Sequence, residues 1–400
     1  MPSESRSPVI VVAPDSFKGS LSAQEAADAV VKGILLALPS CTVHSFPMGD
    51  GGEGTMAALL SRGGSRITVP ARDAAGNMGS ATVGLLADGS AIVEVAEIVG
   101  ITDASCMAIP VEQRTSLGVG DALKTLLDKG VKKICVALGG SSTNDGGAGL
   151  LVALGIELFD AAGKALSPTP AALANVARVD LSKLDRRLAE VELIVMSDVD
   201  NPLTGAQGAT ATFGPQKGVT PALIDKLDAN LAHYADHLEP AFKRSVRNYP
   251  GSGAAGGLGF ALKILGAEIR SGAEVVADTL GVNEAIAKAD WVITGEGRSD
   301  EQTLHGKAPF VICRRARAYG VSTTLLSGAV DAKSLPLLNR HFAGCFSVAP
   351  GPIDVETSMR QAGELLSQRT EQLARVWMAA WPGANPGRSG EQANPVAAAL

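Results

Sequence analysis

The chain has 400 residues, of which 46% are hydrophobic and 19% charged, with 35 basic and 41 acidic side chains. This length allows a large core and favours two domains or one large intertwined unit. The net charge of -6 and the scattered Lys and Arg argue against nucleic acid or an anionic membrane as the main partner. No apolar run approaches the roughly 20 residues that span a bilayer.

The N-terminus and the cysteines predict a cytoplasmic protein. The first residues, MPSESRSPVIVVAPDSF, lack the basic segment and the long apolar stretch of a secretion signal. The five cysteines are odd in number, widely spaced and mostly in apolar surroundings. This pattern is typical of buried thiols in a reducing compartment, and no pair has metal-ligand spacing.

Short apolar runs of strand length recur along the chain, and each ends in a loop with Gly, Asp or Pro. We expect strands at residues 9–13, 43–46, 134–138, 193–196, 291–294, 323–326 and 345–348. Amphipathic stretches predict helices at residues 23–38, 55–61, 148–154 and 309–319. Apolar runs that alternate with helices predict a parallel sheet covered on both sides.

Two regions depart from this alternation. Residues 66–98 contain two alternating runs joined by Ala-Asp-Gly, which predicts a hairpin in an antiparallel or mixed sheet. Residues 201–219 are rich in Gly, Thr and Pro, which predicts a loop with a short strand.

The two regions together predict an α/β fold with a second domain inserted into the first. We expect a Rossmann-like parallel-sheet domain from residues 1–65, 116–200 and 281–381, and an inserted α/β domain of mixed sheet from residues 66–115 and 201–280. The last residues, 382–400, are rich in Pro, Gly and Ala without a periodic face and are expected to be a disordered tail.

Five loops at expected strand ends place a carboxylate beside glycines. They are APDSFKGS (13–20), PMGDGGEGT (47–55), GGSSTNDGGAG (139–149), SDVDNPLTG (197–205) and TGEGRSDEQT (294–303). One Asp after a strand is usually a turn former or a helix N-cap. Ligands of open parallel sheets, however, bind beyond the carboxyl ends of the strands. Five such loops therefore predict one shared site.

The glycine-rich segments 139–149 and 250–259 allow two interpretations. Their backbone N–H groups could hold an anion at a helix N-terminus, or the glycines could serve tight turns and close packing. There is no P-loop motif, and the GxGxxG match at 251–256 follows no strand, so a dinucleotide fold is weakly supported. Four loop cations, Lys18, Lys217, Arg298 and Lys307, complete a set of groups suited to phosphoryl transfer or to a carboxylate-bearing substrate.

Six stretches, in the same order, resemble those of the bacterial class I glycerate kinase family. They are APDSFKGSLSA (13–23), PMGDGGEGT (47–55), GGSSTNDGGAG (139–149), DVDNPLTGAQGA with FGPQKG (198–218), GSGAAGGLG (251–259) and ITGEGRSDEQTLHGKAP (293–309). The resemblance implies an ATP-dependent kinase that requires Mg²⁺ and phosphorylates D-glycerate. It also implies two intertwined α/β domains, one of them Rossmann-like, with the active site in the cleft between them. The 2-phospho product is associated with the class, and 3-phosphoglycerate stays open.

Glycerate carries one carboxylate and MgATP several negative charges, so a site for both needs cations and metal-binding carboxylates. We expect Asp198 and Asp300 to be general base and metal ligand, in an order left open, and Lys307 or Lys217 to neutralise the transferring phosphate. Substrate binding is expected from Asp15, Ser16, Lys18, Asp50 and Arg298, whose guanidinium can grip a carboxylate bidentately. ATP binding is expected from Gly139, Gly140, Ser141, Asn144, Asp145, Lys217, Gly251, Gly253, Gly256, Gly257 and Glu296.

Two other functions stay open from the sequence. The same loops could serve a kinase for another small hydroxy acid, or a non-catalytic sugar-acid binding protein could close on its ligand. A binder of anions would gain nothing from the carboxylates at 15, 50, 198 and 300, which favours the metal-dependent enzyme. D-glycerate and MgATP are therefore the expected partners, and a homodimer is left open.

Overall fold

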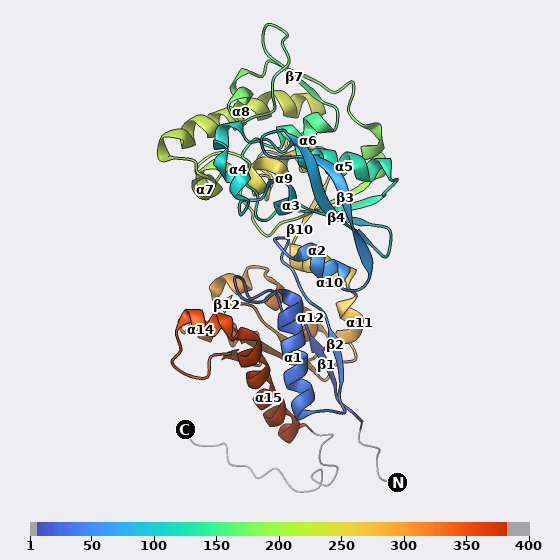
Figure 1. Ribbon diagram of the computed structural model, residues 1–400, viewed down its shortest axis with the longest axis vertical. Helices are drawn as coiled ribbons and strands as arrows, with labels where there is room; N and C mark the ends of the chain where they lie inside the picture. The colour runs from blue at the N-terminus through green and yellow to red at the C-terminus, as the bar shows by residue number, and fades with distance from the viewer. Residues whose placement is uncertain (1–5, 382–400) are drawn as a thin grey trace. The chain divides into compact units, whose positions relative to one another are not determined.

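The computed structural model describes residues 6–381, which form two compact units (Figure 1). Within this range, unit 1 contains residues 6–47, 281–304 and 309–381, and unit 2 contains residues 48–280 and 305–308. Each unit has its own sheet, and no helix of the described range is long and apolar enough to cross a membrane.

Unit 1 contains a five-stranded sheet in which all neighbouring strands are parallel. Its order is β15 (Gly344–Ser347), β13 (Thr323–Ser327), β11 (Trp291–Thr294), β1 (Val9–Val12) and β2 (Thr42–Ser45). Five of the strands expected from the sequence are these strands, so the expected parallel sheet is confirmed for this unit.

Helices cover both faces of this sheet. On one face, α1 (Ala23–Ala37) and α15 (Ala362–Ala380) lie side by side (Figure 1), and their apolar side chains pack with Ile10, Ile293 and Leu326. On the other face, α12 (Ala308–Ala318) and α13 (Leu335–Leu338) enclose Leu325. Unit 1 also contains α11 (Val282–Ile286), β12 (Arg298–Ser299), η5 (Glu301–Leu304), β14 (Ala329–Val330) and α14 (Val355–Arg360).

Unit 2 contains a six-stranded mixed sheet. Its order is β10 (Glu268–Arg270), β9 (Glu192–Met196), β6 (Lys133–Ala137), β5 (Ala91–Glu94), β4 (Met78–Leu86) and β3 (Gly64–Arg72). The first four strands are parallel, whereas β4 is antiparallel to both β5 and β3. The expected hairpin and mixed sheet are therefore confirmed.

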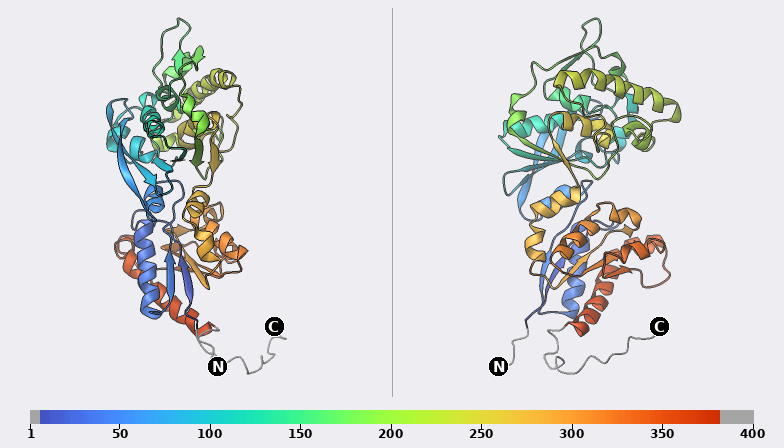
Figure 2. Two further views of the ribbon diagram at one scale, coloured as in Figure 1. Left: turned by 90° about the vertical axis from the view of Figure 1, so that its right-hand side faces the viewer. Right: turned by 180° about the vertical axis from the view of Figure 1, so that it is seen from behind.

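The remaining elements of unit 2 bury this sheet in the larger core of the protein. Its α-helices are α2 (Thr55–Leu60), α3 (Ala96–Val99), α4 (Ala104–Ala108), α5 (Leu117–Asp128), α6 (Ala148–Ala153), α7 (Ala209–Phe213), α8 (Pro221–Phe242), α9 (Ala254–Ile264) and α10 (Gly272–Thr279). Its short elements are η1 (Val111–Gln113), β7 (Glu157–Phe159), η2 (Ala172–Asn175), β8 (Arg178–Asp180), η3 (Arg186–Glu190) and η4 (Pro215–Lys217). The long helix α8 is seen along its length in the view from behind (Figure 2, right).

Two features differ from the sequence expectations. Residues 116–200 belong to unit 2 and not to the unit of the chain termini, because β6 and β9 hydrogen-bond into one sheet with β5. Residues 201–219 form no strand but contain α7 and η4, whose backbone groups bond within the segment, as in the bond from the Lys217 N–H to the Gly214 carbonyl. The expected disordered tail, 382–400, lies outside the described residues.

Candidate functional site

The residues expected in the site fall into two groups, one in each unit. Unit 1 holds Asp15, Ser16, Lys18, Glu296, Arg298 and Asp300, in loops that follow β1 and β11. Unit 2 holds Asp50, Gly139, Gly140, Ser141, Asn144, Asp145, Asp198, Lys217, Gly251, Gly253, Gly256, Gly257 and Lys307. The loops after β1, β6, β9 and β11 do lie at the carboxyl ends of parallel strands, as expected. They belong, however, to two different sheets.

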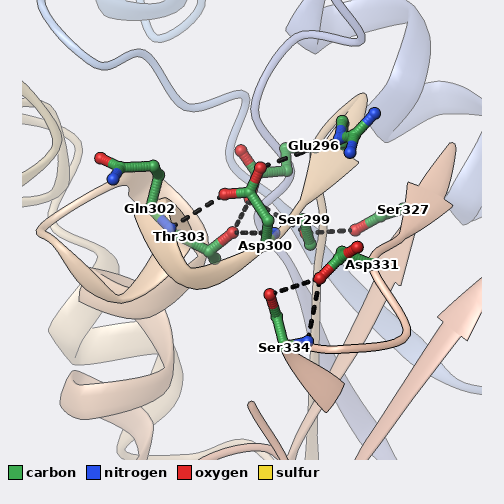
Figure 3. Close-up of polar contacts among 9 residues, drawn as sticks. Glu296, Ser299, Asp300, Gln302, Thr303, Ser327, Asp331 and Ser334 are labelled. Atoms are coloured by element: carbon green, nitrogen blue, oxygen red, sulfur yellow. Dashed lines mark hydrogen bonds and ion pairs between the residues drawn. The ribbon is translucent and has the colours of Figure 1, made fainter. Parts of the chain in front are cut away.

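Figure 3 shows the network that shapes the loop after β11 in unit 1. Glu296 is only 6% exposed, and its Oε1 accepts hydrogen bonds from Ser299 Oγ (2.9 Å) and Thr303 Oγ1 (2.6 Å). Ser299 Oγ also bonds Ser327 Oγ at the end of β13 (2.7 Å). Glu296 therefore holds the loop together, and the ATP-binding role expected from the sequence stays a prediction.

The charged side chains of the same loop reach solvent. Asp300 Oδ1 accepts the backbone N–H of Gln302 (2.9 Å), and its Oδ2 lies 3.8 Å from Arg298 Nε. The Arg298 side chain is 71% exposed and that of Asp300 is 32% exposed. An exposed pair at this distance contributes little to stability. Both groups can therefore change partners at little energetic cost.

The loop after β1 lies against the loop after β11. The Asp15 N–H donates to the Gly295 carbonyl (2.8 Å), and a Cβ added to Gly297 would lie 3.2 Å from Lys18 N. Asp15 is 5% exposed and its Oδ1 accepts the Ser16 N–H (2.6 Å). The structure therefore brings the expected substrate-binding residues of the two loops together.

Asp331 belongs to this group, although our sequence analysis did not identify it. Its N–H donates to the Ser299 carbonyl (2.9 Å), which places it beside Asp300 in Figure 3. Its carboxylate accepts the N–H and Oγ of Ser334, and the Ser334 hydroxyl is the main cause that lowers the pKa of Asp331. The sequence did contain a signal for Asp331, because it lies in the segment Ser-Gly-Ala-Val-Asp (327–331), which directly follows the strand expected at residues 323–326.

In unit 2, Asp50 and Asp198 meet at the start of α10. Asp198 Oδ1 accepts the N–H of Gly272, the first residue of α10 (3.1 Å), and a Cβ on Gly272 would lie 2.2 Å from the Asp50 carbonyl carbon. Ser271 Oγ contacts the Gly306 carbonyl (3.5 Å), so the segment with Lys307 reaches the same helix start. A carboxylate at a helix N-terminus is stabilised by the helix dipole.

The glycine loops of unit 2 pack against each other. The Gly146 N–H donates to the Gly256 carbonyl (2.9 Å), and a Cβ on Gly256 would lie 2.0 Å from the Thr143 carbonyl oxygen. Gly256 also has a φ of +67°, which disfavours any other residue. Close packing, one of the two interpretations left open by the sequence, therefore applies here.

Several amides expected to hold phosphate are already used inside the protein. The N–H groups of Gly139, Gly147 and Gly253 donate to the Gly51 carbonyl, to Asp145 Oδ1 and to the Asn201 carbonyl. These three amides would have to give up these bonds to bind an anion, and the phosphate cradle expected from the sequence stays a prediction.

Asp145 is a fully buried acceptor of hydrogen bonds. Its Oδ2 accepts the N–H and Oγ of Ser116 (both 2.8 Å) and the Gly149 N–H (3.1 Å), and Oδ1 accepts the Gly147 N–H (3.0 Å). Burial raises its pKa, and the four donors act in the opposite direction. Asp145 therefore ties the start of α5 to the 145–149 turn and is inaccessible to a nucleotide in this conformation.

Lys217 is also buried, at 2% exposure. Its Nζ donates to Ser141 Oγ (2.9 Å) and to the Thr143 carbonyl (2.8 Å), so it binds the expected ATP loop from inside. Burial is the main cause that lowers the pKa of Lys217 to about 7; the charge of Asp145 acts against this shift and the charge of Arg114 adds to it. The sequence alone predicts a loop cation that reaches a phosphate, and this role of Lys217 stays a prediction.

The buried ammonium should make stability depend on pH. Unfolded, Lys217 keeps its proton up to pH 10.5, whereas folded it loses the proton near pH 7. Between these values the unfolded chain binds more protons, so the Lys217 contribution to the free energy of unfolding should rise with pH. Urea unfolding across this range should show a steeper rise for the wild type than for Lys217→Met. Parallel curves would contradict the lowered pKa.

Comparisons with known proteins place the chain in a family. The sequence model of the glycerate kinase family matches residues 10–378. A protein of Bacillus subtilis named glycerate kinase is 39% identical over 375 residues, covering 91% of this chain and 96% of the relative. An Escherichia coli protein named glycerate 2-kinase is 38% identical over 378 residues, covering 91% and 97%.

A solved structure agrees with these sequence matches. The crystal structure of a protein assigned as glycerate kinase 2 in Salmonella typhimurium LT2 is similar with a TM-score of 0.83 and 37% identity. It covers 94% of this chain and 99% of the other. All six stretches that carry the resemblance lie inside the matched region, residues 10–378. The chain therefore belongs to the glycerate kinase family.

Proposed function

We propose that this protein is a glycerate kinase, which transfers the γ-phosphoryl group of ATP to a hydroxyl of D-glycerate and releases ADP. The observation that carries the proposal is the family match over residues 10–378, which contains every loop of the candidate site. The charged groups at the strand ends support it, because phosphoryl transfer depends on positioning and on stabilisation of negative charge.

The product we propose is 2-phosphoglycerate. The support is the 38% identical Escherichia coli relative, which is named glycerate 2-kinase. Transfer to the other hydroxyl would give 3-phosphoglycerate, which the residues of the site do not exclude.

We propose Arg298 and Lys18 of unit 1 as the groups that bind the glycerate carboxylate. Arg298 is exposed, and its planar fork can donate two parallel hydrogen bonds to a carboxylate. The backbone of Lys18 lies beside Gly297 in the adjoining loop. Asp15 and Ser16 of the same loop are proposed to bind the glycerate hydroxyls, which carboxylates and serine hydroxyls can hydrogen-bond.

Asp198 and Asp300 are the proposed general base and metal ligand, and Lys307 is the proposed group that neutralises transferred charge. Among residues 6–381, no three His, Cys, Asp or Glu side chains gather to hold a metal ion. Mg²⁺ usually binds proteins through one or two carboxylates and keeps water and substrate phosphates as its other ligands, and its binding here stays a prediction. When bound, Mg²⁺ would neutralise charge on the ATP phosphates.

The proposal is tested by an assay of ADP release with D-glycerate and MgATP, followed by NMR identification of the product. We expect ADP release that depends on glycerate and gives a single phosphoglycerate. Faster turnover of another hydroxy acid would identify a different kinase, and ligand binding without ADP release would identify a non-catalytic binder. The Rossmann-like character of one domain, an active site in the cleft between domains, a homodimer and a cytoplasmic location stay predictions.

Arg298→Lys should raise the KM for glycerate strongly and leave the affinity for ATP nearly unchanged. Lysine keeps the positive charge but lacks the planar fork that holds both carboxylate oxygens. Steady-state kinetics with each substrate varied in turn will measure both effects. If only the KM for ATP rises, Arg298 contacts the phosphates instead.

A further inference from the structure

Two buried cations lie together beneath the loop that follows β6. Of the lysines and arginines within residues 6–381, only Arg114 (3% exposed) and Lys217 (2% exposed) are buried. Their hydrogen bonds go to carbonyls, to one hydroxyl and to the Met107 sulfur, and neither side chain forms a salt bridge among residues 6–381. Burying a cation without a paired anion costs folding free energy. Two such cations in one place therefore suggest a functional role that offsets this cost.

Arg114 fixes Lys217 in place. Its Nη1 donates to the carbonyls of Ser142 (3.0 Å) and Lys217 (2.8 Å), and its Nε donates to the Ile109 carbonyl (2.8 Å). The 142 and 217 segments are thus bridged by one guanidinium. Lys217 Nζ in turn donates to Ser141 Oγ and to the Thr143 carbonyl. The segment of Lys217 is therefore held to the 141–143 segment through both its backbone carbonyl and its side chain.

The charge of this pair is not neutralised by Asp145. Its carboxylate is the buried anion whose field reaches Lys217, but its oxygens already accept four donors from Ser116, Gly147 and Gly149. Below the pKa of Lys217, about 7, two cations face one carboxylate, which leaves a surplus of positive charge next to the loop that begins at Gly139.

Ser141 is the side chain through which Lys217 can act on a bound ligand. Its Oγ accepts the bond from Lys217 Nζ, so its own hydrogen must point to a different acceptor. Its residue is 4% exposed and follows Gly139 and Gly140 at the carboxyl end of β6. A hydroxyl that accepts a bond from an ammonium is a stronger donor, because hydrogen bonds in a chain polarise one another.

We propose that Ser141 donates its hydroxyl hydrogen to an oxyanion of the substrates, that Lys217 polarises this hydroxyl, and that Arg114 is the positioning residue that holds Lys217 against it. The inference rests on the proposed function, which supplies two sources of an oxyanion, the carboxylate of glycerate and the phosphates of ATP. It assigns a role to Arg114 and changes that of Lys217 from a direct phosphate contact to an indirect one.

Ser141→Ala tests the donor, with Ser142→Ala as the matched control. The Ser142 hydroxyl donates to the Val99 carbonyl, away from Lys217, so its loss should lower the melting temperature without changing ligand affinity. Calorimetry should be performed separately with D-glycerate and with a non-hydrolysable MgATP analogue. We expect Ser141→Ala to weaken one ligand by about tenfold or more, the usual loss for a bond to a charged group, and that ligand identifies the oxyanion. Affinities within about twofold of wild type for both ligands would overturn the inference.

Arg114→Lys tests the positioning role. Lysine keeps the charge but lacks the planar guanidinium that donates to four carbonyls, those of Met107, Ile109, Ser142 and Lys217. We expect it to weaken the same ligand as Ser141→Ala does, and to cause no further loss when combined with Ser141→Ala. Losses that add in the double variant, or a lower melting temperature with unchanged affinity, would show a purely structural Arg114.

The outcomes separate this inference from the proposed function. A wild-type protein that does not phosphorylate glycerate contradicts the function. A wild-type protein that does so, while Ser141→Ala binds both ligands normally, contradicts the inference alone.

Discussion

Asp198→Asn and Asp300→Asn should each give a folded protein whose kcat is lower by about 10²–10⁴-fold, the usual cost of losing a general base. Asparagine keeps an oxygen that can accept the bond from Gly272 N–H at position 198 or from Gln302 N–H at position 300. The local structure should therefore survive, while the negative charge needed to accept a proton or bind Mg²⁺ is lost.

The two roles can be separated by the response to Mg²⁺. A variant that has lost a metal ligand should recover part of its activity as the Mg²⁺ concentration is raised, whereas a variant without its general base should not. Asp160→Asn is a suitable control, because Asp160 also accepts backbone N–H groups, from Ala162 and Lys164, in a surface turn. If the kcat of either site variant stays within a few-fold of the wild-type kcat, that residue is neither the general base nor a metal ligand.

Asp145→Ala should destabilise the protein by about 3–5 kcal/mol, the range for removal of one partner from a buried charged network. Three buried N–H groups, of Ser116, Gly147 and Gly149, would lose their acceptor. The buried Lys217 would also lose the favourable charge of Asp145. Urea unfolding of the two proteins will measure the difference.

The matched variant is Asp160→Ala, which removes a carboxylate from a turn where water can replace it. We expect a much smaller change in the unfolding midpoint for this control. If Asp145→Ala is as stable as the control but binds ATP poorly, Asp145 binds ATP, as expected from the sequence, and does not act mainly on stability.

The amino-acid sequence by itself determined the local elements. The apolar run at 291–294 and the alternating runs around Ala87-Asp88-Gly89 became β11 and the β4–β5 hairpin, because side-chain periodicity and turn residues act over a few neighbours. The order of the loop motifs was likewise sufficient to indicate the family, which the match over residues 10–378 confirmed.

The pairing of strands and the burial of charges were decided by the tertiary structure. Runs such as 9–13 and 134–138 are alike in sequence, yet β1 pairs with β11 and β6 pairs with β9, in different sheets. Lys217 stands among glycines and polar residues, which is typical of an exposed loop. It is nevertheless buried, and its acceptor Ser141 lies 76 residues away along the chain, so no local pattern could indicate this contact. Local patterns specify which face of a segment is apolar. Which segments meet depends on contacts between residues far apart in the sequence. Those contacts determine the two groups of site residues and the role of each buried ion.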